Sequence, residues 1–202
     1  MPVFFQQDIN ETTRLGIWKI EEEEGFFKQT VPLHRSVTHP HKRLQHLAGR
    51  FLLRYLFPDF PLEQVQIADT KKPFLPDETY HFSISHCGDY AAVIISRDHR
   101  VGIDIEIPAD KVKRVAHKFI SPDEQRVIHP NTLEEITQVW SAKEAVFKWH
   151  GAGLVDFRQH IQLKEYNNDI FTCYFSKTDS WVAIYLKFLS PLCLSYIYAP
   201  AT

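Results

Sequence analysis

The stretch VGIDIEIP at residues 101–108 decides how the middle of the chain folds. Apolar residues alternate there with Gly102, Asp104 and Glu106, and strict alternation predicts a β-strand with one apolar face. The other face then carries two carboxylates about 7 Å apart along the strand. Two interpretations of this pair are open: wetted side chains on the outside of a sheet, or oxygen ligands held together for a cation.

The segments just before this strand predict that it is the third strand of an antiparallel meander. YHFSIS (80–85) and YAAVIIS (90–96) have strand composition and. HCGD and SRDHR supply the two turns. The meander would therefore cover residues 80–107.

The remaining segments predict helices mixed with further strands. HKRLQHLAGRFLLRYLF (41–57) has apolar residues at helical spacing and ends before Pro58 and. SPDE (121–124) has the pattern of a capping box, and a second long helix is expected at about 132–150, before Gly151 and. Strands are expected at 2–5 and 13–20 and over about 160–200, which gives an α+β fold class.

The order of these elements favours two similar α+β halves. Residues 1–100 would form the amino-terminal half, and residues 101–202 the carboxy-terminal half that carries the acidic residues. Each half combines antiparallel strands with a long helix, and residues 101–107 would lie near the seam between them.

Composition excludes several classes of protein. The net charge is −2 over 202 residues, so no basic field points to nucleic acid. No apolar run approaches membrane-spanning length, and the start MPVFFQQDINETT is not a signal peptide. The three cysteines form no C-x-x-C pair, which favours a reducing compartment. We therefore expect a cytoplasmic protein that binds neither nucleic acid nor membrane.

A third acid changes the interpretation of Asp104 and Glu106. The helix expected at 132–150 has an apolar stripe that includes Trp140 and Phe147, and Glu144 lies within it. A buried glutamate is costly unless it is paired, hydrogen-bonded or bound to metal. Lys148 lies one turn further on, so an ion pair is the simpler alternative. Three converging carboxylates would instead suit Mg²⁺ or Mn²⁺ beside a phosphate ester or anhydride.

Three motifs in a fixed order resemble the signature of a known enzyme family. FSISHCGDY (82–90), VGIDIE (101–106) and WSAKEAVFK (140–148) are similar to motifs of the 4′-phosphopantetheinyl transferase superfamily, in its Sfp-type branch. KKPFLP, SPDE and GAGL resemble further segments. The resemblance runs from about Arg43 to Leu154.

The resemblance implies a reaction and a fold. Members transfer the 4′-phosphopantetheine arm of coenzyme A (CoA) to a serine of an apo acyl or peptidyl carrier protein, and 3′,5′-ADP leaves. The fold would be a pseudo-dimer of two similar halves, each an antiparallel sheet packed with a long helix, with the active site in the cleft between them. A monomer is then the expected state.

The resemblance also implies roles for the acidic and basic residues of the second half. Asp104, Glu106 and Glu144 match the ligands of Mg²⁺, or Mn²⁺, on the CoA pyrophosphate. Lys148, and with it Lys143, matches lysines that contact phosphates or move protons, although a solvated lysine is the simpler interpretation of Lys143. Glu124 matches an acid proposed as the base, yet SPDE also explains it as a helix cap. Glu144 or a metal-bound water are the other candidate bases.

The CoA-binding residues implied by the resemblance lie mostly in the first half. His86 has a loop histidine as its alternative interpretation, and Lys71 is assigned to a solvated turn. An early basic loop is expected as well, with Lys28, His34 and Arg35 as its only candidates. The proposed CoA contacts are Arg50 or Arg43 of the long helix, Lys72, Pro73, Ser85, His86 and Lys143.

The partner and two rival functions complete the expectations. The basic segment 111–118, KVKRVAHK, is a candidate docking surface for an acidic carrier protein. The first rival function is a catalytically inactive paralogue that binds CoA or a nucleotide. The second is an unrelated Mg²⁺-dependent phosphohydrolase, which would need no protein partner.

Overall fold

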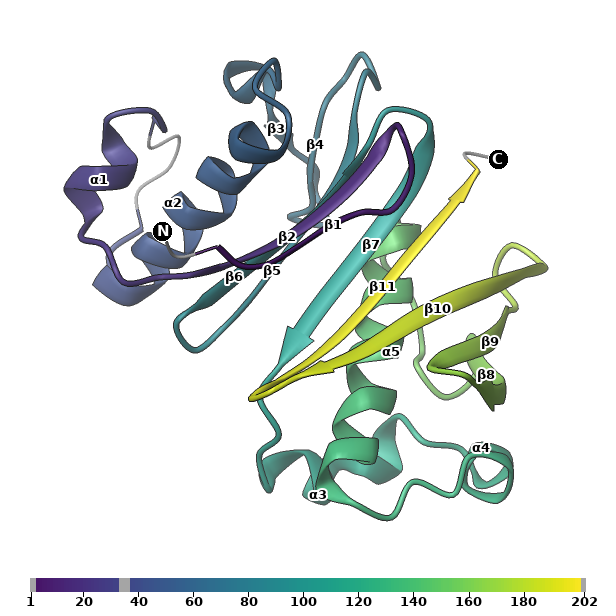
Figure 1. Ribbon diagram of the computed structural model, residues 1–202. Helices are drawn as coiled ribbons and strands as arrows, with labels where there is room; N and C mark the ends of the chain where they lie inside the picture. The colour runs from purple at the N-terminus through teal and green to yellow at the C-terminus, as the bar shows by residue number, and fades with distance from the viewer. Residues whose placement is uncertain (1–2, 33–36, 201–202) are drawn as a thin grey trace. The chain divides into compact units, whose positions relative to one another are not determined.

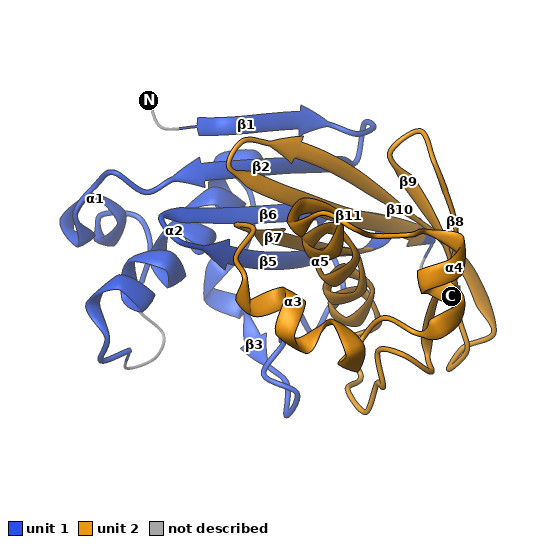
Figure 2. Cartoon of the chain, turned by 90° about the horizontal axis from the view of Figure 1, so that it is seen from below, with its two compact units in different colours: residues 1–100, 200–202 blue, residues 101–199 orange. Residues whose placement is uncertain are grey.

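The computed structural model describes residues 3–32 and 37–200, and the chain divides into two units. One unit comprises residues 1–100 with 200–202, and the other comprises residues 101–199 (Figure 2). His34 and Arg35, two of the three candidates for an early basic loop, lie outside the described residues. Each unit is described by itself below.

The first unit is built on a four-stranded antiparallel sheet with strand order β1-β2-β6-β5. One long helix, α2, packs on this sheet (Figure 1). The strands and helices of the unit are β1 (Val3–Asp8), β2 (Thr13–Lys19), α1 (Glu24–Lys28), α2 (Pro40–Leu56), the 3-10 helix η1 (Leu62–Gln64), β3 (Gln66–Ile67), β4 (Pro73–Phe74), β5 (His81–Cys87) and β6 (Tyr90–Ser96).

The apolar stripe of α2 explains why this helix forms and where it lies. Leu47, Leu52 and Leu56 are almost completely buried, and α2 contacts both β2 and β6. Pro40 occupies the first turn, where proline is tolerated and. Gly16 of β2 lets the sheet lie close to α2, because a Cβ at that position would lie 3.2 Å from Leu52 Cδ1 of the helix. The predicted helix at 41–57 is confirmed to within one residue at either end.

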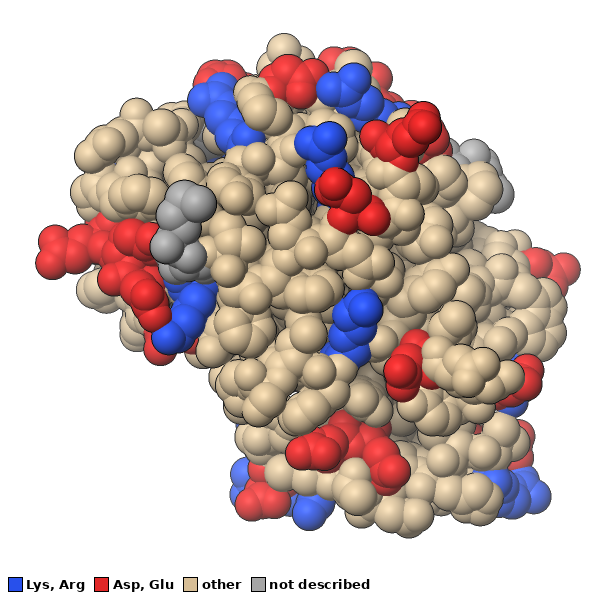
Figure 3. Space-filling view, in the orientation of Figure 1, with Lys and Arg blue, Asp and Glu red and all other residues tan. Residues whose placement is uncertain are grey.

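The acidic run at residues 21–24 lies on the surface beside α1 (Figure 3). Glu24 nevertheless forms ion pairs with Arg43 and Lys28, both at 2.6 Å. These pairs lower the pKa of Glu24 to about 2, with the hydrogen bond from Arg43 as the largest cause. The run is therefore partly a structural contact between α1 and α2.

The second unit carries a five-stranded sheet of order β7-β11-β10-β9-β8, with α5 lying along one face (Figure 1). Val139, Ala142 and Val146 of α5 are buried in the same core as Phe175 and Ile184 of the sheet. The elements are β7 (His99–Glu106), α3 (Lys111–Val115), η2 (Ala116–Lys118), α4 (Pro122–Val127), α5 (Leu133–His150), β8 (Ile161–Asn167), β9 (Ile170–Phe175), β10 (Ser180–Leu189) and β11 (Leu192–Pro200).

Local sequence signals set the limits of the helices in this unit. Thr132 and Glu135 form a capping box at the start of α5, and Gly151, with φ of 74°, ends the helix in the left-handed conformation and. Ser121 and Glu124 form the capping box predicted for α4. Both helix starts therefore follow from side chains that satisfy backbone N–H groups.

The predicted three-stranded meander at 80–107 is wrong in its third strand. β5 and β6 pair in one antiparallel hairpin, but β7 joins the sheet of the second unit beside β11. Strand pairing over such a distance depends on tertiary packing, which alternation within one strand does not encode. The expected mixed α+β class, with antiparallel strands and long helices, is confirmed.

No helix in residues 3–32 or 37–200 is long and apolar enough to cross a membrane.

Candidate active site

Acidic side chains gather where β7 passes along α5 in the second unit. Gly102 permits this close approach, because a Cβ at that position would lie 2.1 Å from the carbonyl oxygen of Ala145. Ser141 of α5 also donates to the backbone oxygen of Asp104 at 3.3 Å. A larger residue at position 102 would separate the strand from the helix. The glycine in the GIDIE motif therefore positions the two acids of β7 next to α5.

The acids are neighbours of one another and of Lys148. Asp104 is only 4% exposed, and its Oδ1 lies 2.7 Å from Lys148 Nζ. Glu106 Oε1 accepts a hydrogen bond from Trp140 Nε1 at 3.1 Å. Burial, with repulsion from Asp104, raises the pKa of Glu144 to about 7, although Lys148 acts in the opposite direction. Glu144 therefore shares one electrostatic environment with both acids of β7.

These carboxylates are not arranged as a ready metal site. Among the residues that the structure describes, no three His, Cys, Asp or Glu side chains form a group that could hold a metal ion. Their chemistry nevertheless fits a hard divalent cation, because all donors are carboxylate oxygens and the two acids of β7 disfavour the charged form of Glu144. Asp104, Glu106 and Glu144 are the residues that could hold such an ion. The expected Mg²⁺ site stays a prediction.

Glu124 and Lys143 form a fully buried ion pair, with Glu124 Oε1 2.6 Å from Lys143 Nζ. The side chain of Lys143 is 0% exposed, so the interpretation of Lys143 as a solvated lysine is wrong. Burial lowers the pKa of Lys143, while Glu124 acts to raise it. The predicted capping box of Glu124 is present. A catalytic role for Glu124 and a CoA contact for Lys143 stay predictions, and burial argues against both.

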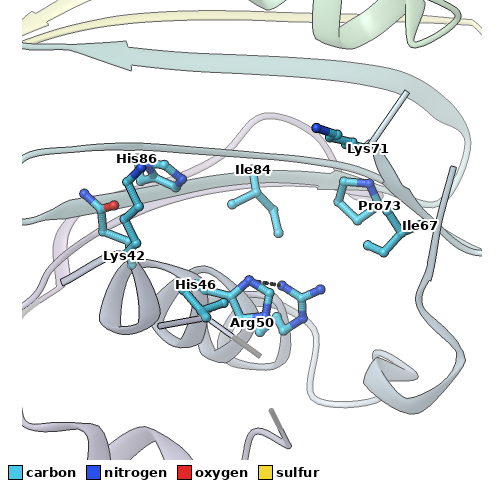
Figure 4. A pocket seen from close by; sticks show the side chains of 10 residues that line it. Lys42, His46, Arg50, Ile67, Lys71, Pro73, Ile84 and His86 are labelled. Carbon is cyan, nitrogen blue, oxygen red and sulfur yellow. Dashed lines mark hydrogen bonds between the residues drawn. The ribbon is translucent and has the colours of Figure 1, made fainter. Parts of the chain in front are cut away.

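A basic pocket of about 370 Å³ lies in the first unit, between α2 and β5 (Figure 4). Arg50, which is only 5% exposed, has its Nη1 3.1 Å from His46 Nδ1. Lys71 and His86 bring further nitrogen atoms to the same pocket. Such a concentration of basic groups suits an anion such as a phosphate. The lining residues are Val37, Lys42, Gln45, His46, Arg50, Ile67, Lys71, Pro73, Ile84 and His86.

The pocket distinguishes between Arg50 and Arg43, which the sequence alone left as alternative CoA contacts. Arg50 lines the pocket. Arg43 instead has its Nε and Nη2 on Glu24 and its Nη1 on the carbonyl of Val37 at 2.8 Å. Lys28, the described candidate for an early basic loop, is likewise paired with Glu24. Arg50 is thus the better placed of the two arginines.

Of the other predicted CoA contacts in the first unit, some line the pocket and some do not. Pro73 and His86 line the pocket. Ser85 is buried, and strand alternation places its side chain on the opposite face of β5 from His86 and. Lys72 is not among the lining residues, and burial lowers its pKa to about 8. Lys71, with φ of 65°, lines the pocket instead.

Sequence reasoning missed the other lining residues of the pocket, which are Val37, Lys42, Gln45, His46, Ile67, Lys71 and Ile84. A signal was present for part of this set: Lys42, His46 and Arg50 recur every four residues, so they share one face of α2 and. The position of Lys71 carried no such signal, because it depends on the loop between β3 and β4.

Fold and site together describe an α+β protein with a carboxylate–lysine cluster in one unit and a basic pocket in the other. A family model described as the 4′-phosphopantetheinyl transferase superfamily matches residues 100–196, which include all three acids and Lys148. The chain belongs to this superfamily, as its motifs predicted. Assignment to the Sfp-type branch stays a prediction.

Curated relatives carry names that agree with the family. Enterobactin synthase component D of Salmonella typhi is 34% identical over 113 residues, 53% of this chain and 47% of the relative. The 4′-phosphopantetheinyl transferase AcpT of Escherichia coli (strain K12) is 33% identical over 117 residues, with 54% and 59% covered. A putative 4′-phosphopantetheinyl transferase of Haemophilus influenzae is 30% identical over 151 residues, with 71% and 64% covered. The chain therefore spans between about half and two thirds of these relatives' lengths.

Proposed function

We propose that this protein is a 4′-phosphopantetheinyl transferase. It would transfer the 4′-phosphopantetheine arm of CoA to a serine hydroxyl of an apo acyl or peptidyl carrier protein in an Mg²⁺-dependent reaction. The observation that carries the proposal is the acidic cluster of Asp104, Glu106 and Glu144 beside Lys148, within the segment that matches the family. The names of the relatives support the same activity.

The bond changes of the reaction define what the residues must do. The serine oxygen forms a bond to the phosphorus next to the pantetheine arm, the P–O bond to the departing 3′,5′-ADP breaks, and the serine proton passes to a base. Without a bound cation the pKa of Glu144 is raised to about 7, which suits that base near neutral pH. A water bound to Mg²⁺ is the alternative base where Glu144 serves as a ligand of the ion. Lys148 would break its ion pair with Asp104 and place its positive charge against the phosphates.

Mg²⁺, when bound by Asp104, Glu106 and Glu144, would neutralise negative charge on the pyrophosphate and on the departing 3′,5′-ADP. The basic pocket of the first unit would hold an anionic end of CoA through Arg50, His46 and Lys71 and. We also propose the pseudo-dimer of two similar halves, with CoA in the cleft between them, on the resemblance alone. A cytoplasmic monomer that binds neither nucleic acid nor membrane stays a prediction.

The carrier protein is proposed to dock on the segment 111–118. Lys111, Lys113, Arg114 and Lys118 are all exposed, which suits an acidic partner. An apolar pocket of about 220 Å³ lies beside this segment and is lined by Val112, Val115 and Trp140 as well as Glu106. An apolar side chain of the carrier next to its serine would fit such a pocket.

Incubation with CoA, Mg²⁺ and an apo carrier protein, followed by mass spectrometry of the carrier, tests the proposal. We expect a mass gain of one phosphopantetheine group with the wild type and a large loss of rate with Glu144→Gln. Glu134→Gln, an exposed acid on the same helix, is the matched control. Release of 3′,5′-ADP without carrier modification would favour a hydrolase, and binding of CoA without either product would favour an inactive paralogue.

Charge reversal tests the docking surface separately. Exchange of Lys113 and Arg114 for glutamate should raise the KM for the carrier and leave the KM for CoA unchanged, because long-range attraction to the acidic carrier is lost. Lys177→Glu, an exposed lysine in the turn between β9 and β10, is the control. An equal effect on both KM values would contradict docking at 111–118.

A further inference from the structure

The ion pair between Glu124 and Lys143 is almost completely buried although it carries two charges. The Glu124 and Lys143 side chains are 3% and 0% exposed, with 2.6 Å between Glu124 Oε1 and Lys143 Nζ. Burial of an isolated charge is very unfavourable, so such a pair persists only where its remaining donors and acceptors are also satisfied. The contacts of the pair therefore show what it holds in place.

All three N–H groups of the Lys143 ammonium are engaged within the second unit. One contact is with Glu124, and the others are hydrogen bonds to the carbonyl oxygens of Phe157 and Ile161, both at 2.8 Å. An ammonium group has three donors, so none remains for a phosphate. Lys143 thus connects the middle of α5 to the segment that leads from α5 into β8.

Glu124 makes a matching set of contacts. Its Oε1 also accepts from the backbone N–H of Leu163 at 3.0 Å, and its Oε2 accepts from the N–H of Ser121 at 2.8 Å. The carboxylate therefore connects the start of α4, the middle of α5 and β8. Both oxygens are engaged in a side chain that is only 3% exposed, so the carboxylate is poorly placed to take a proton from a substrate.

Aromatic packing links the ion pair to the acidic cluster. The ring of Phe157, whose carbonyl accepts from Lys143, lies with its centroid 5.5 Å from Trp140 and 5.7 Å from Phe147. Trp140 in turn donates to Glu106 at 3.1 Å. Glu144 is the next residue after Lys143 on α5. A displacement of the ion pair would therefore move groups on both sides of the cluster.

We propose that Glu124 and Lys143 are positioning residues for the reaction proposed above. They fix the rotation of α5 and the place of Phe157, and thereby hold Glu144 and the Trp140–Glu106 hydrogen bond. Neither residue contacts CoA or the reacting atoms. The inference rests on the proposed transferase function.

A double variant that removes both charges tests the inference without leaving an unpaired buried ion. In Glu124→Gln with Lys143→Met, the glutamine oxygen still accepts from a backbone N–H, and neutral replacement of a buried ion pair is commonly tolerated. We expect a folded protein by circular dichroism whose kcat is reduced by about tenfold or more, as expected for misplaced groups. CoA affinity measured by calorimetry without Mg²⁺ should be unchanged.

A second pair of variants covers the case in which the double variant does not fold. Trp140→Phe keeps an aromatic ring but removes the N–H that holds Glu106, and it should lower kcat in the same way. Trp149→Phe on the same helix is the control, because Trp149 Nε1 makes no hydrogen bond to the described residues. Its kcat should match that of the wild type.

The outcomes separate this inference from the function on which it rests. A folded double variant with wild-type kcat, or one that loses CoA affinity at unchanged kcat, overturns the positioning role. Wild-type kcat in Trp140→Phe also overturns it. A wild-type protein that leaves every apo carrier unmodified overturns the proposed function, and the inference falls with it.

Discussion

The Glu144→Gln substitution gives a stability test of the acidic cluster that needs no substrate. Burial and repulsion from Asp104 raise the pKa of Glu144 from 4.5 to about 7. Below pH 4.5 the Glu144 carboxyl keeps its proton in both the folded and the unfolded protein, so its burial does not lower the free energy of unfolding. As pH rises toward 7, the unfolded chain loses the proton before the folded protein does, and the free energy of unfolding falls. At ~1.4 kcal/mol per pKa unit, the full loss is about 3 kcal/mol.

Urea denaturation in the presence of EDTA measures this loss. The wild type should lose about 2 to 3 kcal/mol between pH 5 and pH 8 relative to Glu144→Gln, because glutamine does not titrate and a smaller part of the full loss has already occurred at pH 5. Glu134→Gln is the control, since that residue is exposed on the same helix, and its difference from the wild type should stay small at each pH. The same stability difference between wild type and Glu144→Gln at pH 5 and pH 8 would refute the reasoning.

Addition of Mg²⁺ extends the same experiment to the metal. An ion that binds only the folded protein stabilises it by mass action, and it should do so most at pH 8, where Glu144 is ionised. The wild type should therefore recover stability with Mg²⁺, and Glu144→Gln should recover less. Equal stabilisation of the two proteins would contradict Glu144 as a metal ligand.

Three further predictions concern packing, the basic pocket and the thiols. Gly102→Ala should destabilise the protein by about 2 kcal/mol or more in urea denaturation, because its Cβ would lie 2.1 Å from a backbone oxygen. Gly25→Ala, with nothing within 4 Å, is the control and should change stability little. Arg50→Met should weaken CoA binding about tenfold or more in calorimetry, and unchanged affinity would argue against the pocket. Ellman's reagent at pH 8 should modify Cys87 but not Cys173, since burial raises the pKa of Cys173 to about 12, and rapid loss of both thiols would contradict that burial.

Local signals explain why much of the fold was predictable from the sequence. The capping boxes at Ser121 and Thr132, the stop at Gly151 and the apolar stripe of α2 each depend on residues a few positions apart. Such short-range rules act in the same way whatever the remainder of the chain does. The pairing of β7 with β11 was missed because it joins segments far apart in the sequence.

The candidate site was predictable in its chemistry and less so in its contacts. The order of the three motifs identified the acids and Lys148, which the structure brings together. The last of these motifs also includes Lys143, and the further segment SPDE includes Glu124. The side chains of Lys143 and Glu124 are engaged with each other inside the second unit. Neighbouring residues of one motif point in different directions on a helix, so a motif alone does not say which of them reach solvent.

The sequence by itself determined the class of the fold, the family and the types of group available for chemistry, because periodicity, caps and motif order are properties of short segments. Only the tertiary structure decided which cations meet which anions: Lys148 pairs with Asp104, Lys143 with Glu124, and Arg43 with Glu24. It also decided that Arg50 lines the basic pocket. The physical reason is that charge–charge interactions depend on distance and burial, and both are set by packing between segments that are remote in the chain.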